Sequence, residues 1–514
     1  MSGNLYSQFL SAMPDAERPF VRTSSGRVVT YGDVVRLSGK MANALTGLGL
    51  ERGDRVAVQV EKSPEALILY LACLRAGAVY LPLNTAYTIS ELEYFVADAE
   101  PKIFVVAPSK GSELVRMTTR LGVAVIETLG ADGASGSLLE CAENAPADFS
   151  DLPTNPDDLA AILYTSGTTG RSKGAMLSHA NLGSNAKTLK EIWRFTSDDV
   201  LLHALPIFHT HGLFVASNVI LSVGASMIFL PKLDPNEVFR LMVDSTTMMG
   251  VPTFYVRLLQ DARLNRKATA HMRLFISGSA PLLEETHLEW RERTGHAILE
   301  RYGMTETNMN TSNPYDGDRI PGSVGFPLPG VLLRVTDPET GAKLPQGEIG
   351  MLEVKGPNVF SGYWRMEEKT KVEFRADGYF ITGDLVTIDE RGYVFIVGRG
   401  KDLIISGGYN VYPKEVESEI DALPGVLESA VVGVAHRDFG EAVTAIVVPK
   451  KDEQLSEKNL MTSLRKKLAN YKLPKRVIFI DELPRNTMGK VQKNILRETH
   501  RDLYAQGGNN GGST

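Results

Sequence analysis

The chain has 514 residues, and its 55 Lys and Arg against 61 Asp and Glu give a formal net charge of −6. Hydrophobic residues make up 43% and charged residues 23%, which is the mix of a globular protein and excludes a disordered or low-complexity chain. The charge gives no support for nucleic-acid binding. Two cysteines, Cys73 and Cys141, cannot form a disulfide framework or a four-cysteine zinc site, and they favour a reducing compartment.

The first residues carry no basic segment followed by an apolar run, so we expect no secretory signal and a cytoplasmic location. The most apolar stretch, residues 66–83, is interrupted by Arg75 and Gly77 and is too short to cross a bilayer. It predicts a buried helix followed by a strand, and no membrane span. Residues 507–514 are predicted to be a flexible tail.

Short apolar runs alternate with helical patterns over the first part of the chain. The runs that predict strands are residues 55–60, 78–83, 102–107, 123–126, 159–164, 200–205, 225–230 and 272–277. Between the first two, Pro64 opens a predicted helix that ends at Leu74. Continuous apolar strands joined by helices predict parallel sheets covered on both faces, with ligands bound beyond the carboxyl ends of the strands.

The pattern changes at about residue 330, where short runs separated by glycine-containing turns predict antiparallel hairpins that could close into a small barrel. Predicted helices at 412–423 and 456–471, with strands between and after them, form a further α+β pattern. The fold class is therefore α/β, with a large N-terminal domain of parallel-rich sheets and a small C-terminal domain. The expected boundaries are 1–398 for the N-terminal domain, 399–402 for a hinge and 403–506 for the C-terminal domain.

The strongest motif is Thr165-Ser-Gly-Thr-Thr-Gly-Arg-Ser-Lys-Gly174, directly after a predicted strand. Glycines let backbone N–H groups approach phosphate oxygens, hydroxyl side chains add donors, and Lys173 adds positive charge. The spacing is not that of a Walker A loop. The alternative is a flexible surface loop.

This motif resembles the phosphate loop of the adenylate-forming enzymes, the superfamily that includes the acyl-CoA synthetases. Five further motifs resemble those of the superfamily and occur in its order: YGMTE at 302–306, GYFITGD at 378–384, GRGKD at 398–402, SGGYN at 406–410 and PRNTMGK at 484–490. The chain is identified as a member on these motifs, which span nearly its whole length.

The resemblance implies that ATP activates a carboxylate as an acyl adenylate, which then passes to a thiol. Lys490 would neutralise the two anionic reactants, Thr305 would contact the α-phosphate and Glu306 would hold Mg²⁺. The residues implied for ATP and AMP are Thr165, Ser166, Gly167, Thr168, Thr169, Gly170, Lys173, Tyr302, Asp384 and Arg399. Those implied for CoA are Ser406, Gly407, Gly408 and Tyr409, with Lys401 at a hinge that lets the small domain rotate between the half-reactions.

The segment 250–257 ends in Arg257, on a helix that the resemblance places beside the acyl pocket. A buried arginine needs an anionic partner, and the second carboxylate of a dicarboxylic acid would supply one. Ser279 could donate to the same carboxylate, and His209 is a candidate for the acyl or thiol side of the site. Alternatively, Arg257 is exposed and paired with Asp261, and His209 is a hydrogen-bonded core histidine.

Around these residues the chain resembles the malonyl-CoA synthetases, with Met304 expected to limit the substituent at C2. The expected reaction makes malonyl-CoA from malonate, ATP and CoA, with methylmalonate as a slower substrate. The alternatives are a ligase for short or medium monocarboxylates, an enzyme that loads a carrier protein, and a nucleotide-binding protein without turnover. The expected partners are small molecules, together with a lysine acetyltransferase and a deacylase acting on Lys490, and the expected state is a monomer or weak dimer.

Overall fold

The computed structural model describes residues 3–165, 172–407, 409–486 and 489–504. By internal contacts the chain divides into two compact units. The first contains residues 1–321, 325–332 and 354–380, and the second contains 322–324, 333–353 and 381–514. Each is described by itself. Across the described residues, no helix is both long and apolar enough to span a membrane.

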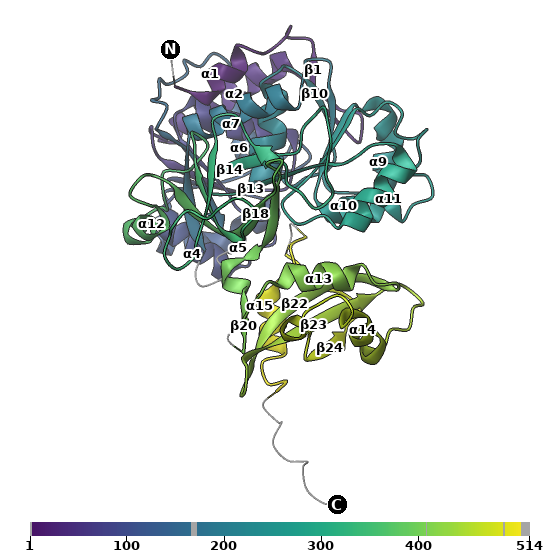
Figure 1. Ribbon diagram of the computed structural model, residues 1–514. Helices are drawn as coiled ribbons and strands as arrows, with labels where there is room; N and C mark the ends of the chain where they lie inside the picture. The colour runs from purple at the N-terminus through teal and green to yellow at the C-terminus, as the bar shows by residue number, and fades with distance from the viewer. Residues whose placement is uncertain (1–2, 166–171, 408, 487–488, 505–514) are drawn as a thin grey trace, which may run out of the picture. The chain divides into compact units, whose positions relative to one another are not determined.

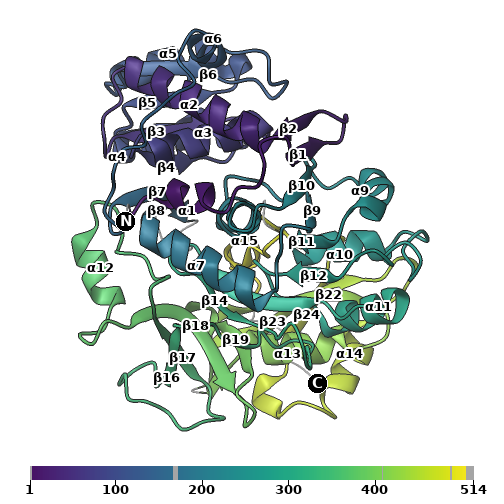
Figure 2. The same cartoon turned by 90° about the horizontal axis from the view of Figure 1, so that it is seen from above.

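The first unit contains a six-stranded sheet near its amino end (Figure 2). Its strands, in spatial order, are β6 (Val125–Thr128), β5 (Ile103–Val106), β3 (Arg55–Gln59), β4 (Val79–Pro82), β7 (Leu159–Thr165) and β8 (Lys173–Ser178). All are parallel except β8, which runs antiparallel to β7. The predicted strands of this region are therefore confirmed.

Both faces of this sheet are covered, as the continuous apolar runs predict. Ala57, Phe104 and Val106 pack against α4 (Ile89–Ala99) and α5 (Gly111–Arg120). The alternate strand residues are also buried, because side chains on a strand point to opposite faces in turn. Helix α3 (Pro64–Arg75) is buried along its entire length and precedes β4, so residues 66–83 form the predicted helix and strand. Ser63 caps this helix and Pro64 occupies its first turn.

A nine-stranded sheet forms the rest of the first unit. Its order is β15 (Phe326–Pro327), β14 (Asn308–Ser312), β13 (Leu299–Met304), β12 (Leu274–Ser277), β11 (Thr247–Gly250), β9 (Val200–His203), β10 (Ser226–Phe229), β1 (Pro19–Thr23) and β2 (Val28–Thr30). The strands from β13 to β1 are parallel, and β14, β15 and β2 are antiparallel additions. Helices α10 (Pro252–Leu259) and α11 (Glu284–Thr294) lie side by side over it (Figure 1), with Tyr255 and Trp290 in the shared core.

The part that begins near residue 330 forms a four-stranded sheet of β16 (Leu332–Thr336), β17 (Gly350–Lys355), β18 (Phe380–Ile388) and β19 (Val394–Arg399). Strands β18 and β19 pair antiparallel, as the turn pattern predicts.

The second unit ends in a five-stranded sheet covered on both faces (Figure 1). It contains β21 (Tyr409–Val411), β20 (Ile404–Ser406), β23 (Gly440–Pro449), β22 (Val426–His436) and β24 (Arg476–Phe479). Val431 and Val443 face a core shared with α13 (Pro413–Asp421) and α14 (Glu457–Leu464). Val432 and Ile446 face the opposite core, closed by α15 (Lys493–Thr499). Helix α14 is shorter than the predicted 456–471.

Candidate active site

The phosphate-loop motif begins at the end of β7 and returns at the start of β8. Thr165 and Lys173 are opposite each other in the antiparallel pair, so the two described ends of the motif lie side by side. The predicted residues Ser166, Gly167, Thr168, Thr169 and Gly170 lie outside the described residues.

The Lys173 ammonium is held by acidic and aromatic groups of the same unit. Its Nζ lies 3.1 Å from Oε1 of Glu373 and 4.0 Å from the ring centre of Tyr363. The Lys173 side chain is only 20% exposed. Lys173, which is predicted to bind phosphate, is thus paired with a carboxylate of the protein.

The motif 302–306 spans the end of β13 and the turn that follows it. Tyr302 is buried, whereas Met304 and Thr305 are partly exposed. Glu306 is 6% exposed, and its Oε1 lies 3.0 Å from the hydroxyl of Tyr363. In the part of the chain that the structure describes, no group of three or more His, Cys, Asp or Glu side chains could hold a metal ion.

The segment around His209 leads into a π-helix, residues His211–Ser217. π-Helices are rare and frequently occur at functional sites. His211 Nδ1 lies 3.2 Å from Oγ of Ser279, which has a left-handed backbone with φ of 73°. Burial lowers the pKa of His209 to about 4, so its imidazole is neutral at pH 7. His211 contacts Ser279, and His209 is two positions before His211 in the chain. His209 and Ser279 therefore belong to one polar region of the first unit.

Arg257 lies in the last turn of α10 and is exposed. Tyr255 and Leu258 of the same helix face the core, which directs Arg257 toward solvent. The prediction that Arg257 is buried is wrong for this structure. Asp261, its proposed i+4 partner, instead pairs with Arg263 at 2.6 Å.

The buried cation of this region is Arg301, on β13 directly before Tyr302. It is 3% exposed, and its Nε and Nη2 have no hydrogen-bond partner among the described residues. Burial lowers its pKa to about 9. Its guanidinium lies against Gly278, where an added Cβ would be 2.5 Å from Arg301 Cζ.

Four further buried polar atoms, in the segment 209–211 and at the end of β12, also lack hydrogen-bond partners among the described residues. They are Nε2 of His209, Oγ1 of Thr210, Nε2 of His211 and Oγ of Ser277. Arg301 is close enough to His211 to lower the pKa of that imidazole further, after burial has lowered it. Unpaired polar atoms in a protein interior are rare, so this group is suited to a small polar ligand.

Arg301 was not predicted from the sequence. The available signal was Glu300-Arg301, two charged residues inside a strand that leads directly into the Tyr302 motif. Glu300 is paired with His287 at 3.2 Å, which leaves Arg301 as the member without a hydrogen-bonded partner.

In the second unit, Asp384 and Arg399 form an ion pair with Oδ1 and Nε 2.7 Å apart. The Arg399 charge and then burial lower the pKa of the Lys490 ammonium to about 8, with a smaller effect from Lys401. The structure thus brings together four predicted residues from three motifs, namely Asp384, Arg399, Lys401 and Lys490. The cluster is rich in positive charge, which suits a phosphate or carboxylate ligand.

The predicted CoA residues lie at the β20–β21 hairpin. Ser406 and Tyr409 are opposite each other, and the N–H of Gly407, with φ of 59°, donates to the carbonyl of Phe439 at 2.8 Å. Tyr409 is 60% exposed and stacks on Tyr471 with ring centres 4.8 Å apart. Gly408 lies outside the described residues.

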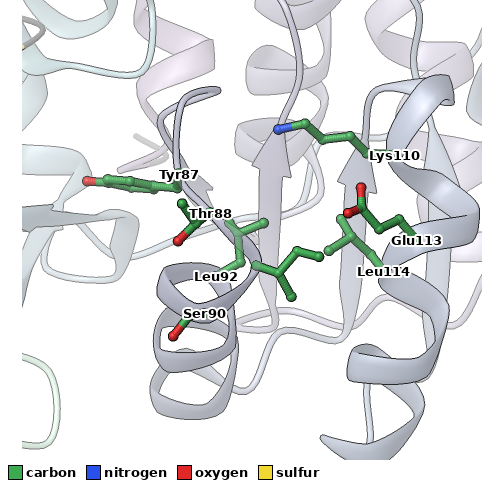
Figure 3. Close-up of a pocket in the computed structure, with 8 residues that line it drawn as sticks. Tyr87, Thr88, Ser90, Leu92, Lys110, Glu113 and Leu114 are labelled. Atoms are coloured by element: carbon green, nitrogen blue, oxygen red, sulfur yellow. The ribbon is translucent and has the colours of Figure 1, made fainter.

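A separate surface hollow of about 480 Å³ lies between α4 and α5 (Figure 3). Leu92 and Leu114 line it from the two helices, and Lys110 and Tyr87 lie at its rim. The Lys110 ammonium donates to the carbonyl of Thr85 at 2.9 Å. None of the predicted site residues lines this hollow.

The comparisons with known proteins cover almost the whole chain. The family described as "AMP-binding enzyme" matches residues 11–364, and "AMP-binding enzyme C-terminal domain" matches residues 415–490. A crystal structure of ATP-bound MatB from Rhodopseudomonas palustris is 63% identical, with a TM-score of 0.96, and the match covers 98% of this chain and 100% of that one.

Curated relatives include a malonate–CoA ligase of Arabidopsis thaliana, 33% identical over 97% of this chain and 89% of the relative. A mitochondrial malonate–CoA ligase of Mus musculus is 36% identical over 93% of this chain and 87% of the relative. The two family matches include the motifs at 165–174, 302–306 and 484–490. The chain belongs to the AMP-binding enzyme family.

Proposed function

We propose that the protein is an ATP-dependent ligase that makes malonyl-CoA from malonate and CoA through malonyl-AMP, releasing AMP and pyrophosphate. The single observation that carries the choice of acid is Arg301, a buried guanidinium with unpaired Nε and Nη2. A carboxylate accepts two parallel hydrogen bonds from a guanidinium. A monocarboxylic acid would leave this cation without a charge partner, whereas the second carboxylate of malonate would pair with it. The similarity to malonate–CoA ligases supports the same acid.

The polar groups around Arg301 are proposed to complete the malonate site. Ser279 has a hydroxyl that already contacts His211, and it can donate to the second carboxylate. His209 is neutral at pH 7 and can donate without adding charge. Met304 is proposed to limit substituents at C2, and the exposed Arg257 is kept as a proposed ligand at the outer side of the site. With the second carboxylate held at Arg301, the first carboxylate of malonate must face ATP in order to react.

Lys490 is proposed to contact both the reacting carboxylate and the α-phosphate in the first half-reaction. Two anions must approach each other, and a cation on both reduces their repulsion. Asp384 and Arg399 are proposed for the ribose, Tyr302 for the adenine, and Thr305 and the residues 165–173 for the phosphates. Residues 399–402, including Lys401, are proposed as the hinge between the domains 1–398 and 403–506, and Ser406 to Tyr409 as CoA ligands.

Glu306 is proposed as the protein ligand of Mg²⁺. A buried carboxylate held by a tyrosine hydroxyl fits this ion, which is bound in such enzymes through one or two carboxylates and the phosphates of the substrate. The ion supplies charge neutralisation at the phosphates. Glu306 itself supplies a fixed oxygen ligand.

Reversible acetylation of Lys490 is proposed as a control of the enzyme. The lowered pKa of Lys490 gives it a larger fraction of free amine than an ordinary lysine has. Acetylation removes the charge. A cytoplasmic location and a monomer or weak dimer remain part of this proposal.

The test is AMP release by the purified protein with Mg·ATP, with and without CoA, on malonate, methylmalonate, succinate, acetate, butyrate, octanoate and benzoate. We expect the highest kcat/KM for malonate, a lower value for methylmalonate, and dependence on CoA. A preference for acetate or butyrate would overturn the diacid proposal. Adenylate formation that ignores free CoA would identify an enzyme that loads a carrier protein.

A further inference from the structure

Tyr363 lies between two carboxylates of the first unit, those of Glu306 and Glu373. Its hydroxyl oxygen is 3.0 Å from Oε1 of Glu306 and 2.6 Å from Oε2 of Glu373. A phenol has one proton to donate, so the two carboxylates share a single donor. The proposed magnesium ligand is therefore linked through one side chain to a second carboxylate, which no sequence motif singled out.

Glu373, the last residue of α12 (Glu367–Glu373), is held by two lysines as well as by Tyr363. Its Oε1 lies 3.1 Å from Nζ of Lys173 and 2.8 Å from Nζ of Lys369. The Lys173 ammonium also lies over the ring of Tyr363. Glu306, Tyr363, Glu373 and Lys173 therefore form one connected network. Its two ends are the proposed metal ligand and the proposed phosphate ligand.

The backbone around Tyr363 is fixed to both ends of this network. The N–H of Phe360 donates to the carbonyl of Glu306 at 2.8 Å. On the other side, the N–H of Trp364 donates to the carbonyl of Gly174 at 2.8 Å, next to Lys173. Tyr363 is 2% exposed and packs edge-on against Phe360 with ring centres 4.8 Å apart. The hydroxyl is thus presented to Glu306 by a rigid segment.

We propose that Tyr363 and Glu373 are positioning residues of the nucleotide site. Tyr363 orients the Glu306 carboxylate that binds Mg²⁺, and Glu373 fixes the Tyr363 hydroxyl and the Lys173 ammonium before the nucleotide arrives. This rests on the roles proposed above for Glu306 and Lys173, but not on the identity of the acid. Groups that hold a metal ligand in place commonly change metal affinity by about 10- to 100-fold when they are removed.

The test is Tyr363→Phe, which removes one oxygen and keeps the ring under Lys173. Binding is measured without any acid, by electron paramagnetic resonance of Mn²⁺ added to the protein with a non-hydrolysable ATP analogue, and by calorimetry of the Mg²⁺ complex. We expect the metal dissociation constant to rise about 10-fold or more. In turnover, the metal concentration for half-maximal adenylation should rise in parallel, with the KM for CoA unchanged.

The matched control is Tyr31→Phe. The hydroxyl of Tyr31 is equally buried and donates to the carbonyl of Ala225 at 2.7 Å, far along the chain from the nucleotide motifs. Tyr31→Phe should lower the melting temperature by about as much as Tyr363→Phe does, and it should leave metal binding unchanged. Glu368→Gln controls for loss of a carboxylate from α12, since Glu368 is exposed and pairs with the exposed Lys371 at 2.7 Å.

A second variant, Glu373→Gln, keeps the proposal falsifiable if Tyr363→Phe does not fold. It should weaken both metal and nucleotide-analogue binding, and the double variant should lose less than the sum of the two single losses, because the residues act as a unit. Wild-type metal affinity in either folded variant would overturn the proposal. Because acid is absent from the binding assays, a failure here is distinguishable from a failure of the malonate assignment.

Discussion

Nε of Arg399 lies 2.7 Å from Oδ1 of Asp384, and this ion pair stands beside the ammonium of Lys490. The pair does not cancel the effect of Arg399 on the lysine, because the pKa of Lys490 is lowered to about 8 with Arg399 as the largest cause. Lys490, which is proposed to act as a cation, therefore loses its charge as pH rises through about 8, well below the pH at which an ordinary lysine does.

The pH dependence of adenylation should show this loss. Lys490 is protonated below its pKa, so kcat/KM for ATP should fall as pH rises through about 8. Arg399→Gln removes the main repulsive charge and should move this alkaline limb to higher pH, although the proposed ribose contact is also lost. Pyrophosphate release measured from pH 6.5 to 10 checks both. An alkaline limb in the same place in the variant would contradict the role of Arg399.

Lys490→Ala should separate the two half-reactions. Formation of malonyl-AMP from malonate and ATP should fall by about 100-fold or more, because a charge-stabilising contact of the transition state is removed. Formation of malonyl-CoA from preformed malonyl-AMP should stay within a few fold of wild type. Single-turnover measurements of each step are the readout. Equal losses in both steps would contradict a role of Lys490 that is confined to the first half-reaction.

Arg301→Met should have opposite effects on activity and stability. With malonate, kcat/KM should drop by about 100-fold or more, the range for truncating one partner of a buried charge pair. The melting temperature should rise, because a buried guanidinium without a partner is replaced by an apolar chain of similar length. Arg257→Ala, which removes an exposed arginine, should lower activity less and leave the melting temperature unchanged. Lower stability in Arg301→Met would mean that Arg301 is structural.

The stability of the second unit should depend on Asp421. Burial raises its pKa to about 7, and Ser429 Oγ donates to its Oδ1 at 2.7 Å. The folded state therefore holds a proton that the unfolded state releases near pH 4, and the stabilisation present at low pH is lost as pH rises through 7. Asp421→Asn should be more stable than wild type at pH 8, by about 1–3 kcal/mol, with the difference shrinking toward pH 5. Urea unfolding at several pH values is the measurement, and a constant difference would contradict the assignment.

Eight strands of the two sheets in the first unit could be predicted, because each of these is an apolar run in the sequence. The runs at 55–60 and 102–107 became β3 and β5, and Pro64 became the first residue of α3. Strand β11, Thr247–Gly250, was not predicted, since its run of threonine, methionines and glycine lacks the β-branched residues typical of buried strands. The family assignment from the motifs is confirmed by the match to residues 11–364.

The burial of the two arginines could not be predicted from the sequence. Arg257 is four positions before Asp261 and stands in a distinctive segment, but its exposure depends on the rotation of α10, which is set by Tyr255 and Leu258 in the core. Arg301 is buried because β13 lies inside the nine-stranded sheet, between β12 and β14. Which strands are central is a property of long-range pairing that local patterns do not contain.

Gly278 has a consequence for how acid preference could change over time. Any residue with a side chain at this position would need the space that the Arg301 guanidinium fills, because a Cβ there would come within 2.5 Å of Cζ. A lineage could therefore abandon diacids without mutating the arginine, through a single nucleotide change of the glycine codon to alanine. Screens for altered substrate range that randomise only the cationic residues would overlook this position, and it is the one to include first.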